Sequence, residues 1–494
     1  MQTLPIGIQS FGMLRRDNML YVDKTGKLVE LIFSRPRRFG KSLTLSTLEA
    51  MFTGQTDLFK GLKAEQWVQE QAQHPSPVLR FDISTIFYKA LKTMLTRSSK
   101  IFDVKLTGDT VSDMFEELIE KLYEQRGQVV VLIDEYDKPI LDNLTNFAKA
   151  NEMREVLHSF YTTLKSCDEY LRFVMLMGIS KFSKVGVFSA MNNLLDISMM
   201  ENYGEIAGYT QQELEYYFDG WLKFIAEQEK FCREEILERL KNYYDGFCFN
   251  GTTRVYNPFS ILSFFCTGEF KNYWYESGSP SFMVNWMKDH HIQNPEDYRH
   301  IVVNGNDFIS IQEIEQADAA SLLYQSGYLT IEKKEEQLLT LDYPNKEVMN
   351  SLSSMYLKLI YRVEGYALLG NEIWKVLRQG DIPEIVRLYN IAIANIPYDD
   401  YAKNCNEFWY RSLFVMLLRG AGIISYSQPH TSKGRADVVL KFQNLVVVLE
   451  FKFAKNSSEV EVKKREGWEQ LQERGYTKIS AVFVADDEHR QIVI

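Results

Sequence analysis

The stretch RPRRFGKS at residues 35–42 decides the fold of the first part of this 494-residue chain. A P-loop requires the pattern G-x-x-x-x-G-K-[ST]. Gly40, Lys41 and Ser42 match its second half, although Arg35 occupies the position of the first glycine. Gly40 would let the backbone approach phosphate groups, and the amides that open the following helix would face the anionic oxygens. The alternative is a chance Gly-Lys-Ser that opens an ordinary helix.

The residue types of this stretch suit a nucleotide with its metal ion. In a P-loop, Lys41 would reach the β and γ phosphates, and the Ser42 hydroxyl would ligate Mg²⁺. The arginines before the glycine would add positive charge near the phosphates. We therefore expect a site for ATP and Mg²⁺ whose contacts come from Arg37, Arg38, Phe39, Gly40, Lys41 and Ser42.

A second motif, VVVLIDE at residues 129–135, complements the first. A continuous apolar run is typical of a strand buried on both faces of a parallel sheet. Asp134, at the end of that strand, would hold Mg²⁺, and Glu135 would orient or deprotonate the attacking water. The alternative is an ordinary strand that ends in a solvated acidic turn. Ser180, after a similar run at Phe173–Met177, would either sense the γ-phosphate or only cap the strand end.

Changes of pattern along the chain predict an α/β protein of three domains. Helical spacing in Ser42–Phe52 and Val111–Tyr123 alternates with strands such as Pro77–Ser84, which favours a parallel sheet. The next region is aromatic-rich and mostly helical, with one long helix expected at Gln211–Gln228. We expect a P-loop ATPase domain at 1–205, a helical lid or winged-helix-like region at 206–345, and an α/β restriction-endonuclease-like domain at 346–494.

Several strings in the first half resemble the bacterial AAA-ATPase-like family. They are LPIGIQSF (4–11), YVDKT (21–25), SRPRRFGKSLTLSTLEAMF (34–52), VVVLIDEYDKPI (129–140), GISKFSKVGVFSAMNNLLDIS (178–198) and YYDGFCF (243–249). The resemblance implies a P-loop ATPase domain followed by a helical region. It also implies that Arg35 in place of glycine is a feature of the family.

Another constellation, D-x12-E-x-K, lies near the carboxyl end of the chain. It consists of Asp437, Glu450 and Lys452. Two antiparallel strands with a tight turn bring the start of one strand beside the end of the other, and residues two apart share a strand face. The two carboxylates would hold one or two Mg²⁺ ions that activate water at a phosphodiester, and Lys452 would position that water. The alternative is a hairpin whose charged residues are merely solvated.

Flanking residues add to this constellation. Glu407, in a helix before the strands, would add a metal contact, and Gln470, in the helix after them, would orient the site or touch the nucleic-acid backbone. The order of these elements resembles the PD-(D/E)XK nuclease superfamily, in the branch often fused behind AAA-ATPase-like domains. Its N-E-x-x-Y and G-R-x-D patterns match residues 406–410 and 434–437. Many relatives have histidine at the position of Arg411, so a role for that histidine is lost here.

Charge and composition limit the partners. The net charge of -10 makes the whole chain an unlikely polyanion binder, so contact with nucleic acid, DNA rather than RNA, must use local basic residues. The five cysteines form no C-x-x-C pair, which argues against a zinc ribbon or a disulfide framework. Neither a signal peptide nor a membrane-spanning run is apparent, and we expect a cytoplasmic protein. The local basic residues are Lys433, Arg435, Lys455, Lys463, Lys464 and Arg465.

These motifs lead to one main hypothesis and two alternatives. The main hypothesis is an enzyme that hydrolyses ATP and cleaves nucleic acid under nucleotide control. The first alternative is an ATP-switched signalling or binding module whose nuclease fold is catalytically silent. The second is a multimeric remodelling ATPase, although no residue can be assigned as its arginine finger.

Overall fold

The fold is described from a computed structural model of the chain. It describes residues 1–494 apart from 28–32, 35, 85–87, 144–145, 180–194, 230, 277–285, 288–297, 309–318, 361, 397–404, 421–422, 424, 428–429, 432–433, 436, 443–444 and 474–479. The chain forms two compact units. The first comprises Met1–Trp286 and Tyr298–Glu347, and the second comprises Met287–Asp297 and Val348–Ile494. The three-domain division expected from the sequence stays a prediction.

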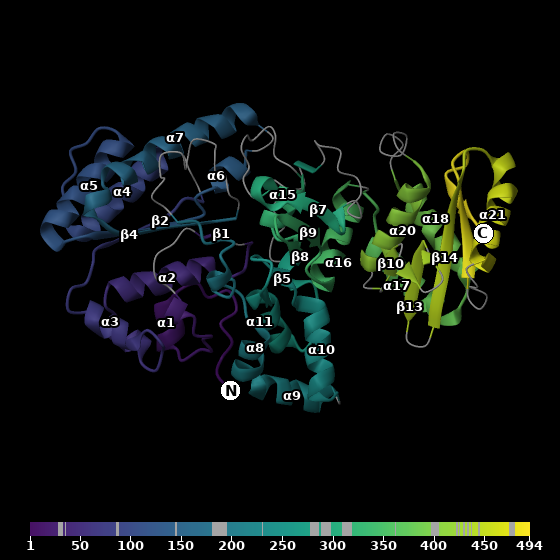
Figure 1. Cartoon of the computed structure of the whole chain (residues 1–494), viewed down its shortest axis with the longest axis horizontal. Coiled ribbons are helices and arrows are strands. Elements are labelled where there is room, and N and C mark those ends of the chain that lie inside the picture. Colours follow the sequence, from purple (N-terminus) through teal and green to yellow (C-terminus); the bar gives the residue numbers. More distant parts are fainter. Residues whose placement is uncertain are drawn as a thin grey trace. The chain divides into compact units, whose positions relative to one another are not determined.

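A four-stranded parallel sheet organises the start of the first unit (Figure 1). Its strand order is β1-β4-β3-β2, so β4 separates the strand before the P-loop from the strand that carries the acidic motif. All six residues of β3 are buried, which explains their continuous apolar character. The strands are β1 (Phe33–Ser34), β2 (Val78–Asp82), β3 (Val129–Asp134) and β4 (Leu171–Gly178).

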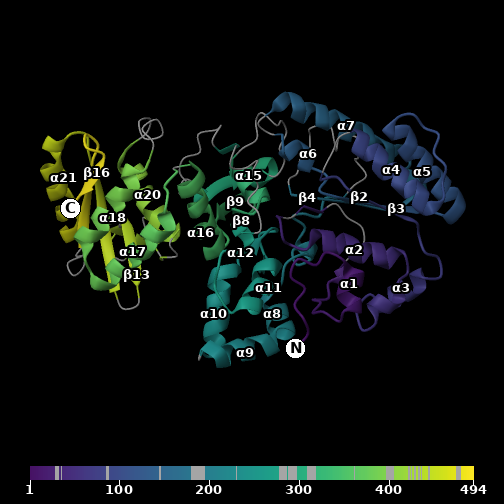
Figure 2. The same cartoon turned by 180° about the vertical axis from the view of Figure 1, so that it is seen from behind.

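Helices cover both faces of this sheet (Figures 1 and 2). Phe81 of β2 packs against Phe115 of α5 and Phe160 of α7 on one face. On the other face, Phe173 of β4 packs against Phe52 of α2. The helices are α1 (Phe11–Arg16), α2 (Lys41–Phe52), α3 (Glu65–Gln71), α4 (Tyr88–Phe102), α5 (Val111–Arg126), α6 (Lys138–Leu141) and α7 (Phe147–Ser166).

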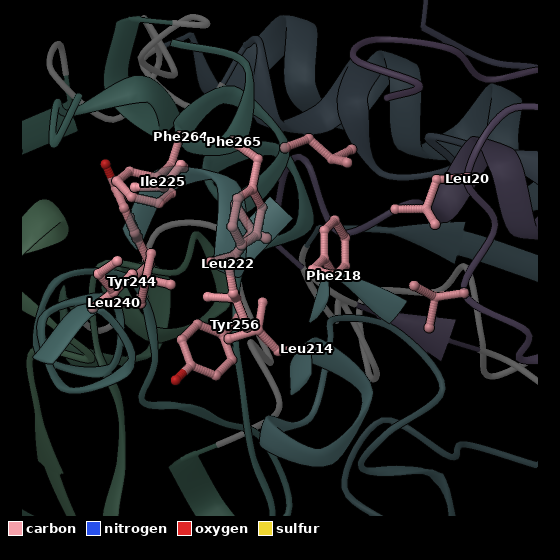
Figure 3. Close-up of a cluster of buried hydrophobic side chains, with 14 of the residues drawn as sticks. Leu20, Leu214, Phe218, Leu222, Ile225, Leu240, Tyr244, Tyr256, Phe264 and Phe265 are labelled. Atoms are coloured by element: carbon pink, nitrogen blue, oxygen red, sulfur yellow. The ribbon is translucent and has the colours of Figure 1, made fainter. Parts of the chain in front are cut away.

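The rest of the first unit is mostly helical and has an aromatic core (Figure 3). That core also takes in Leu20 from the N-terminal segment. Its helices are α8 (Gln211–Tyr217), α9 (Asp219–Glu229), α10 (Arg233–Tyr244), α11 (Pro258–Thr267), α12 (Tyr273–Glu276), α14 (Gly305–Phe308) and α15 (Ala319–Gln325). Its strands are the hairpin β5 (Phe247–Cys248) and β6 (Arg254–Val255), and the sheet of β7 (Ile301–Asn304), β8 (Thr330–Glu335) and β9 (Leu338–Asp342).

The expectation of one long helix over Gln211–Gln228 is wrong. α8 starts at a capping box between Thr210 and Glu213 but ends at Tyr217, and α9 begins at Asp219. Phe218 between them is fully buried and stacks on Phe265 of α11, with ring centroids 5.0 Å apart. The helical spacing of apolar residues continues through the break, so only the tertiary contact reveals it.

The second unit contains a five-stranded mixed sheet of order β10-β13-β14-β15-β16. β14 pairs antiparallel with β13 and parallel with β15. Phe414 of α20 packs on Phe451 and Phe483 at one face, while α21 covers the opposite face. The strands are β10 (Ser425–Ser427), β13 (Val438–Phe442), β14 (Leu445–Ala454), β15 (Ser480–Asp486) and β16 (Gln491–Val493), and the helices are α16 (Lys346–Met355, which begins in the first unit), α17 (Tyr366–Gln379), α18 (Ile382–Ala394), α20 (Glu407–Gly420) and α21 (Val460–Glu473).

The expected fold class is confirmed: a parallel α/β P-loop region, a mostly helical middle region and a C-terminal α/β domain follow one another along the chain. Within the described ranges, no helix combines the length and the apolar character needed to cross a membrane.

Candidate active sites

The P-loop turn places a buried cation at the start of α2. Gly40 has φ +79°, a left-handed conformation that glycine adopts without strain, and it caps the helix. Lys41 is only 8% exposed, and its Nζ donates a hydrogen bond to the Pro36 carbonyl at 3.0 Å. Burial lowers the pKa of Lys41, while the nearby Asp134, Asp137 and Glu135 carboxylates raise it. In such an arrangement the buried ammonium group can bind an anion, and the neighbouring carboxylates can bind a cation that is bound to the same anion.

The two predicted Mg²⁺ residues of this site touch each other. Ser42 Oγ, in the first turn of α2, donates to Asp134 Oδ2 at the end of β3 across 2.6 Å. The other oxygen, Asp134 Oδ1, accepts the Glu135 amide at 3.1 Å. The hydroxyl and the carboxylate are hard oxygen donors of the kind that Mg²⁺ prefers, so the residues present fit this ion.

Glu135 lies beside this pair in an unusual backbone conformation. Its φ is +52°, which is uncommon outside glycine and asparagine. Burial raises the pKa of its carboxyl group, and the charge of Lys41 lowers it. Among the other nearby charges is Asp82, which ends β2 next to Asp134. A raised pKa makes a carboxylate a better proton acceptor.

The residues after Glu135 pack tightly against the end of β4. Asp137 Oδ2 accepts the Ile179 amide at 2.9 Å. A Cβ on Gly178 would lie 2.6 Å from Asp137 Oδ1 and from the Tyr136 ring, so only glycine fits there. This contact fixes the end of β4 beside the acidic turn. Ser180, the predicted sensor residue, lies outside the described residues, as does Arg35.

The predicted phosphate-binding residues before Gly40 pack against the middle region of the first unit. Phe39 makes edge-on contacts with Phe247 and Phe249, at centroid distances of 4.9 and 5.4 Å. The Arg37 carbonyl accepts a hydrogen bond from the indole of Trp274 at 3.3 Å. Thus the YYDGFCF segment, which the sequence singled out without a role, holds the P-loop in place.

Arg38 and the neighbouring cavity extend this contact. The Arg38 guanidinium carbon lies 4.8 Å from the centre of the Phe259 ring. A cavity of about 70 Å³ lies next to Gly40, between the N-terminal segment and the middle region. Its lining includes Leu20, Tyr21, Val22, Thr44 and Tyr209.

The second unit brings the three residues of the D-x12-E-x-K pattern together. Lys452 Nζ donates to Glu450 Oε1 and to the Phe451 carbonyl, each at 3.0 Å. Asp437 Oδ2 accepts the Phe451 amide at 2.9 Å across the two strands. Glu450 is only 2% exposed and Lys452 9%. The hairpin register expected from the spacing is confirmed, because Val438 pairs with Leu449.

Arg411 enters this group, which the sequence interpretation missed. Its Nη1 donates to Asp437 Oδ1 at 2.9 Å, and its side chain is only 4% exposed. The guanidinium also lies 5.2 Å from the centre of the Phe408 ring. Arg411 follows Glu407 by four residues in α20, so both side chains lie on one helix face. This spacing of four residues is the feature of the sequence that could have predicted Arg411 as a member of the site.

The carboxyl group of Glu407 lies close enough to these charged side chains for them to affect its pKa. Burial raises the pKa of its carboxyl group; Lys452 and Arg411 lower it, and Asp437 and Glu450 raise it. The group therefore contains three carboxylates and two fixed cations. Carboxylate oxygens suit Mg²⁺, so these residues fit the ion in kind. Among the described residues, however, neither Asp437 nor Glu450 belongs to a group of three or more acidic, histidine or cysteine side chains whose ligand atoms all lie within 4.8 Å of one another.

The helix α21 covers the site, with Gln470 at its side. A Cβ on Gly467 would lie 2.4 Å from Val482 Cγ1 and 3.4 Å from Lys452 Cγ, so this glycine permits close packing over the lysine stem. Gln470 is half-buried one turn further on, and no hydrogen bond described for the chain joins it to the acidic residues. Of the expected basic residues, Lys433 and the Arg435 side chain fall outside the described residues, Lys455 and Arg465 are exposed, and Lys463 and Lys464 are half-buried.

Comparison with known proteins assigns a domain family to each of the two regions that contain the candidate sites. Residues 5–188 match the AAA-ATPase-like family model, described as "Predicted AAA-ATPase". Residues 405–489 match a model of the PD-(D/E)XK nuclease superfamily.

Two solved structures share a low overall similarity with the chain. Cdc6p from Pyrobaculum aerophilum is 12% identical, with a TM-score of 0.26, over 67% of this chain and 87% of that one. The Orc1 protein of Aeropyrum pernix, solved in complex with DNA, is 12% identical, with a TM-score of 0.23, over 66% of this chain and 86% of that one. Scores this low support no argument about function.

A full-length relative decides the family. A protein of Azotobacter chroococcum mcd 1, described as an uncharacterized protein in the vnfD 5' region, is 34% identical over 96% of this chain and 92% of its own length. The chain therefore belongs to the same family as this Azotobacter protein, and it joins an AAA-ATPase-like domain to a PD-(D/E)XK nuclease superfamily domain.

Proposed function

We propose that the first unit binds and hydrolyses ATP. The observation that carries this proposal is the 2.6 Å contact between Ser42 and Asp134 beside the buried Lys41. Ser42 and Asp134 would hold Mg²⁺, which neutralises charge on the phosphates. Lys41 would bind the terminal phosphates, and Glu135 would accept a proton from the attacking water. The cavity beside Gly40, with Tyr21 and Tyr209 in its lining, would receive part of the base.

The second unit is proposed to cleave phosphodiester bonds in nucleic acid, with DNA as the preferred substrate. The contact of Lys452 with Glu450, beside Asp437, supports this most directly. Asp437, Glu450 and Glu407 would hold the divalent ion, which supplies Lewis-acid activation of water and phosphate. Lys452 would position that water by a hydrogen bond from its Nζ or neutralise charge on the phosphate. We further propose that the nucleotide state of the first unit controls this cleavage.

Cleavage assays with the full-length protein test this proposal. Labelled single-stranded DNA, duplex DNA and RNA are incubated with Mg²⁺, without nucleotide, with ATP, or with a non-hydrolysable ATP analogue. The wild type should cleave at least one DNA substrate, and Lys452→Ala should be inactive while it still folds and binds ATP. Equal cleavage by both proteins would reveal a contaminant. No cleavage under any nucleotide condition would contradict the assignment.

One observation favours a second candidate function, an ATP-switched binding module. Arg411 and the Phe451 amide already occupy the two oxygens of Asp437. In this alternative the nuclease fold binds nucleic acid or a protein but does not cleave. Tight binding of a DNA probe, unchanged by Mg²⁺ and without products, would support it over the enzyme.

A further inference from the structure

One exposed helix of the first unit carries a concentrated positive charge. α4 (Tyr88–Phe102) contains four basic residues and no acidic residue, although the whole chain has a net charge of -10. All four are exposed, and within the described part of the chain none is paired with a carboxylate. We call them the α4 basic stripe: Lys89, Lys92, Arg97 and Lys100.

The stripe lies on one side of the helix. Leu91 and Leu95, on the other side, are fully buried, and α4 packs there against α5. At the helical rise, the distance from Lys89 to Lys100 is about 16 Å. The basic side chains, with Thr93 and Thr96, line a shallow groove of about 390 Å³. The stripe is therefore a continuous surface and not four scattered charges.

The chemistry of the stripe suits phosphate groups better than base edges. Lysine acts as a point charge for phosphate, whereas base recognition commonly uses bidentate side chains. The hydroxyls of Thr93 and Thr96 donate to carbonyls of their own helix, at 2.7 Å each, and are not free to contact bases. Contact with a polyanion here would thus depend on charge and not on sequence.

The same surface is poorly suited to a lipid bilayer. Helices that lie in a membrane interface bury large apolar or aromatic residues next to their basic face. Among the described side chains of α4, the large apolar side chain that is exposed is that of Ile101, whose exposed fraction is 68%. None of the described aromatic rings of α4 is exposed. A nucleic-acid backbone, which carries dense charge without an apolar phase, is the better match.

We propose that the α4 basic stripe binds the phosphodiester backbone of nucleic acid without sequence preference. The stripe would hold the substrate by a part of the chain outside the nuclease superfamily domain. This inference rests in part on the proposed action on nucleic acid, which supplies the class of partner.

Salt-dependent binding of the full-length protein tests the stripe. Fluorescence anisotropy is measured with a labelled duplex of about 30 base pairs, in EDTA and without nucleotide, from about 50 to 200 mM KCl. The variant carries Lys89→Ala, Lys92→Ala, Arg97→Ala and Lys100→Ala. Each lost phosphate contact lowers the salt slope by about 0.9, so the slope should fall by about 3 to 4. The loss of affinity of the variant relative to the wild type should therefore be about 100-fold larger at the lowest salt than at the highest.

A control variant removes the same charge elsewhere. Four exposed lysines, each already paired with a carboxylate, are replaced by alanine: Lys60, Lys223, Lys333 and Lys375. This variant should keep the wild-type slope. Circular dichroism checks that both variants fold, and a glutamine version of the stripe variant replaces the alanine version if that one is unstable.

Three outcomes would overturn the proposal. An unchanged slope in the stripe variant excludes backbone contact by α4. Equal losses in the stripe and control variants assign the effect to net charge. Loss of binding to anionic phospholipid vesicles, with duplex binding intact, makes the surface one for lipid. Because EDTA prevents metal-dependent cleavage, these results are independent of the nuclease assignment. Binding through the stripe, together with no cleavage in the separate assay with Mg²⁺, would count against the proposed nuclease alone.

Discussion

At the scale of single residues, both candidate sites bury charged side chains close to one another. Lys41 is buried against the Pro36 carbonyl, near the acidic end of β3. Glu450 is buried against Lys452. Buried charges of this kind are costly unless they are paired. Their retention at these positions is understandable if they bind phosphate or metal.

Glu135→Gln should separate ATP binding from ATP hydrolysis. The amide cannot accept the proton of the attacking water, so kcat should fall by about 100-fold or more, while the Kd for ATP stays near the wild-type value. In the wild type, the raised pKa of Glu135 should move the acidic limb of the kcat profile to higher pH, because the base must be ionised. Phosphate release and a fluorescent ATP analogue measure the two quantities. Undiminished turnover in the variant would exclude Glu135 as the base.

Arg411→Met should show what the buried arginine does at Asp437. Loss of one partner from a buried ion pair costs about 3 kcal/mol, so denaturant unfolding in EDTA should show lower stability of the second unit. Mn²⁺ should bind the variant more tightly than the wild type, because the Asp437 oxygen is no longer occupied by Arg411. Arg411→Lys keeps the charge and is the control. Calorimetric titration that finds equal Mn²⁺ affinity in all three proteins would show that Arg411 does not compete with metal.

At the scale of helices and strands, short-range patterns predicted a large part of the sites. The buried strand that ends at Asp134 and the hairpin that carries Glu450 both follow from local sequence, because strand burial and residue pairing have a simple periodicity. The break at Phe218 does not, since it depends on packing against Phe265. The contact of Phe39 with the middle region also joins segments far apart in the chain. No periodicity within either segment could reveal it.

Gly467→Ala should disturb the helix over the candidate nuclease site. The added methyl group would collide with Val482 at 2.4 Å, and overpacking of this kind costs about 1–3 kcal/mol. We expect a lower unfolding midpoint of the second unit and weaker cleavage, because α21 can no longer lie over Lys452. Glu469→Ala, an exposed change in the same helix, is the matched control. A Gly467→Ala protein as stable and active as this control would contradict the packing argument.

At the scale of the whole molecule, one chain contains an ATPase-like domain and a nuclease superfamily domain. The aromatic contacts of Phe39 give the candidate nucleotide site a physical link to the middle region of its own unit. If binding of ATP moves the P-loop, the movement would be transmitted first to Phe247 and Phe249, because Phe39 contacts both rings. We expect the proposed nucleotide control of cleavage to begin with this contact.

The most direct test compares metal-dependent DNA cleavage by the wild type and by Lys41→Ala, each with and without ATP. In the wild type, the rate should change when ATP is added. In Lys41→Ala, which cannot hold the terminal phosphates, Mg²⁺-dependent cleavage should persist at one rate whether or not ATP is present. A wild-type rate that ATP leaves unchanged would contradict the coupling of the two domains, and a variant that responds to ATP as the wild type does would contradict the role of Lys41 in that coupling.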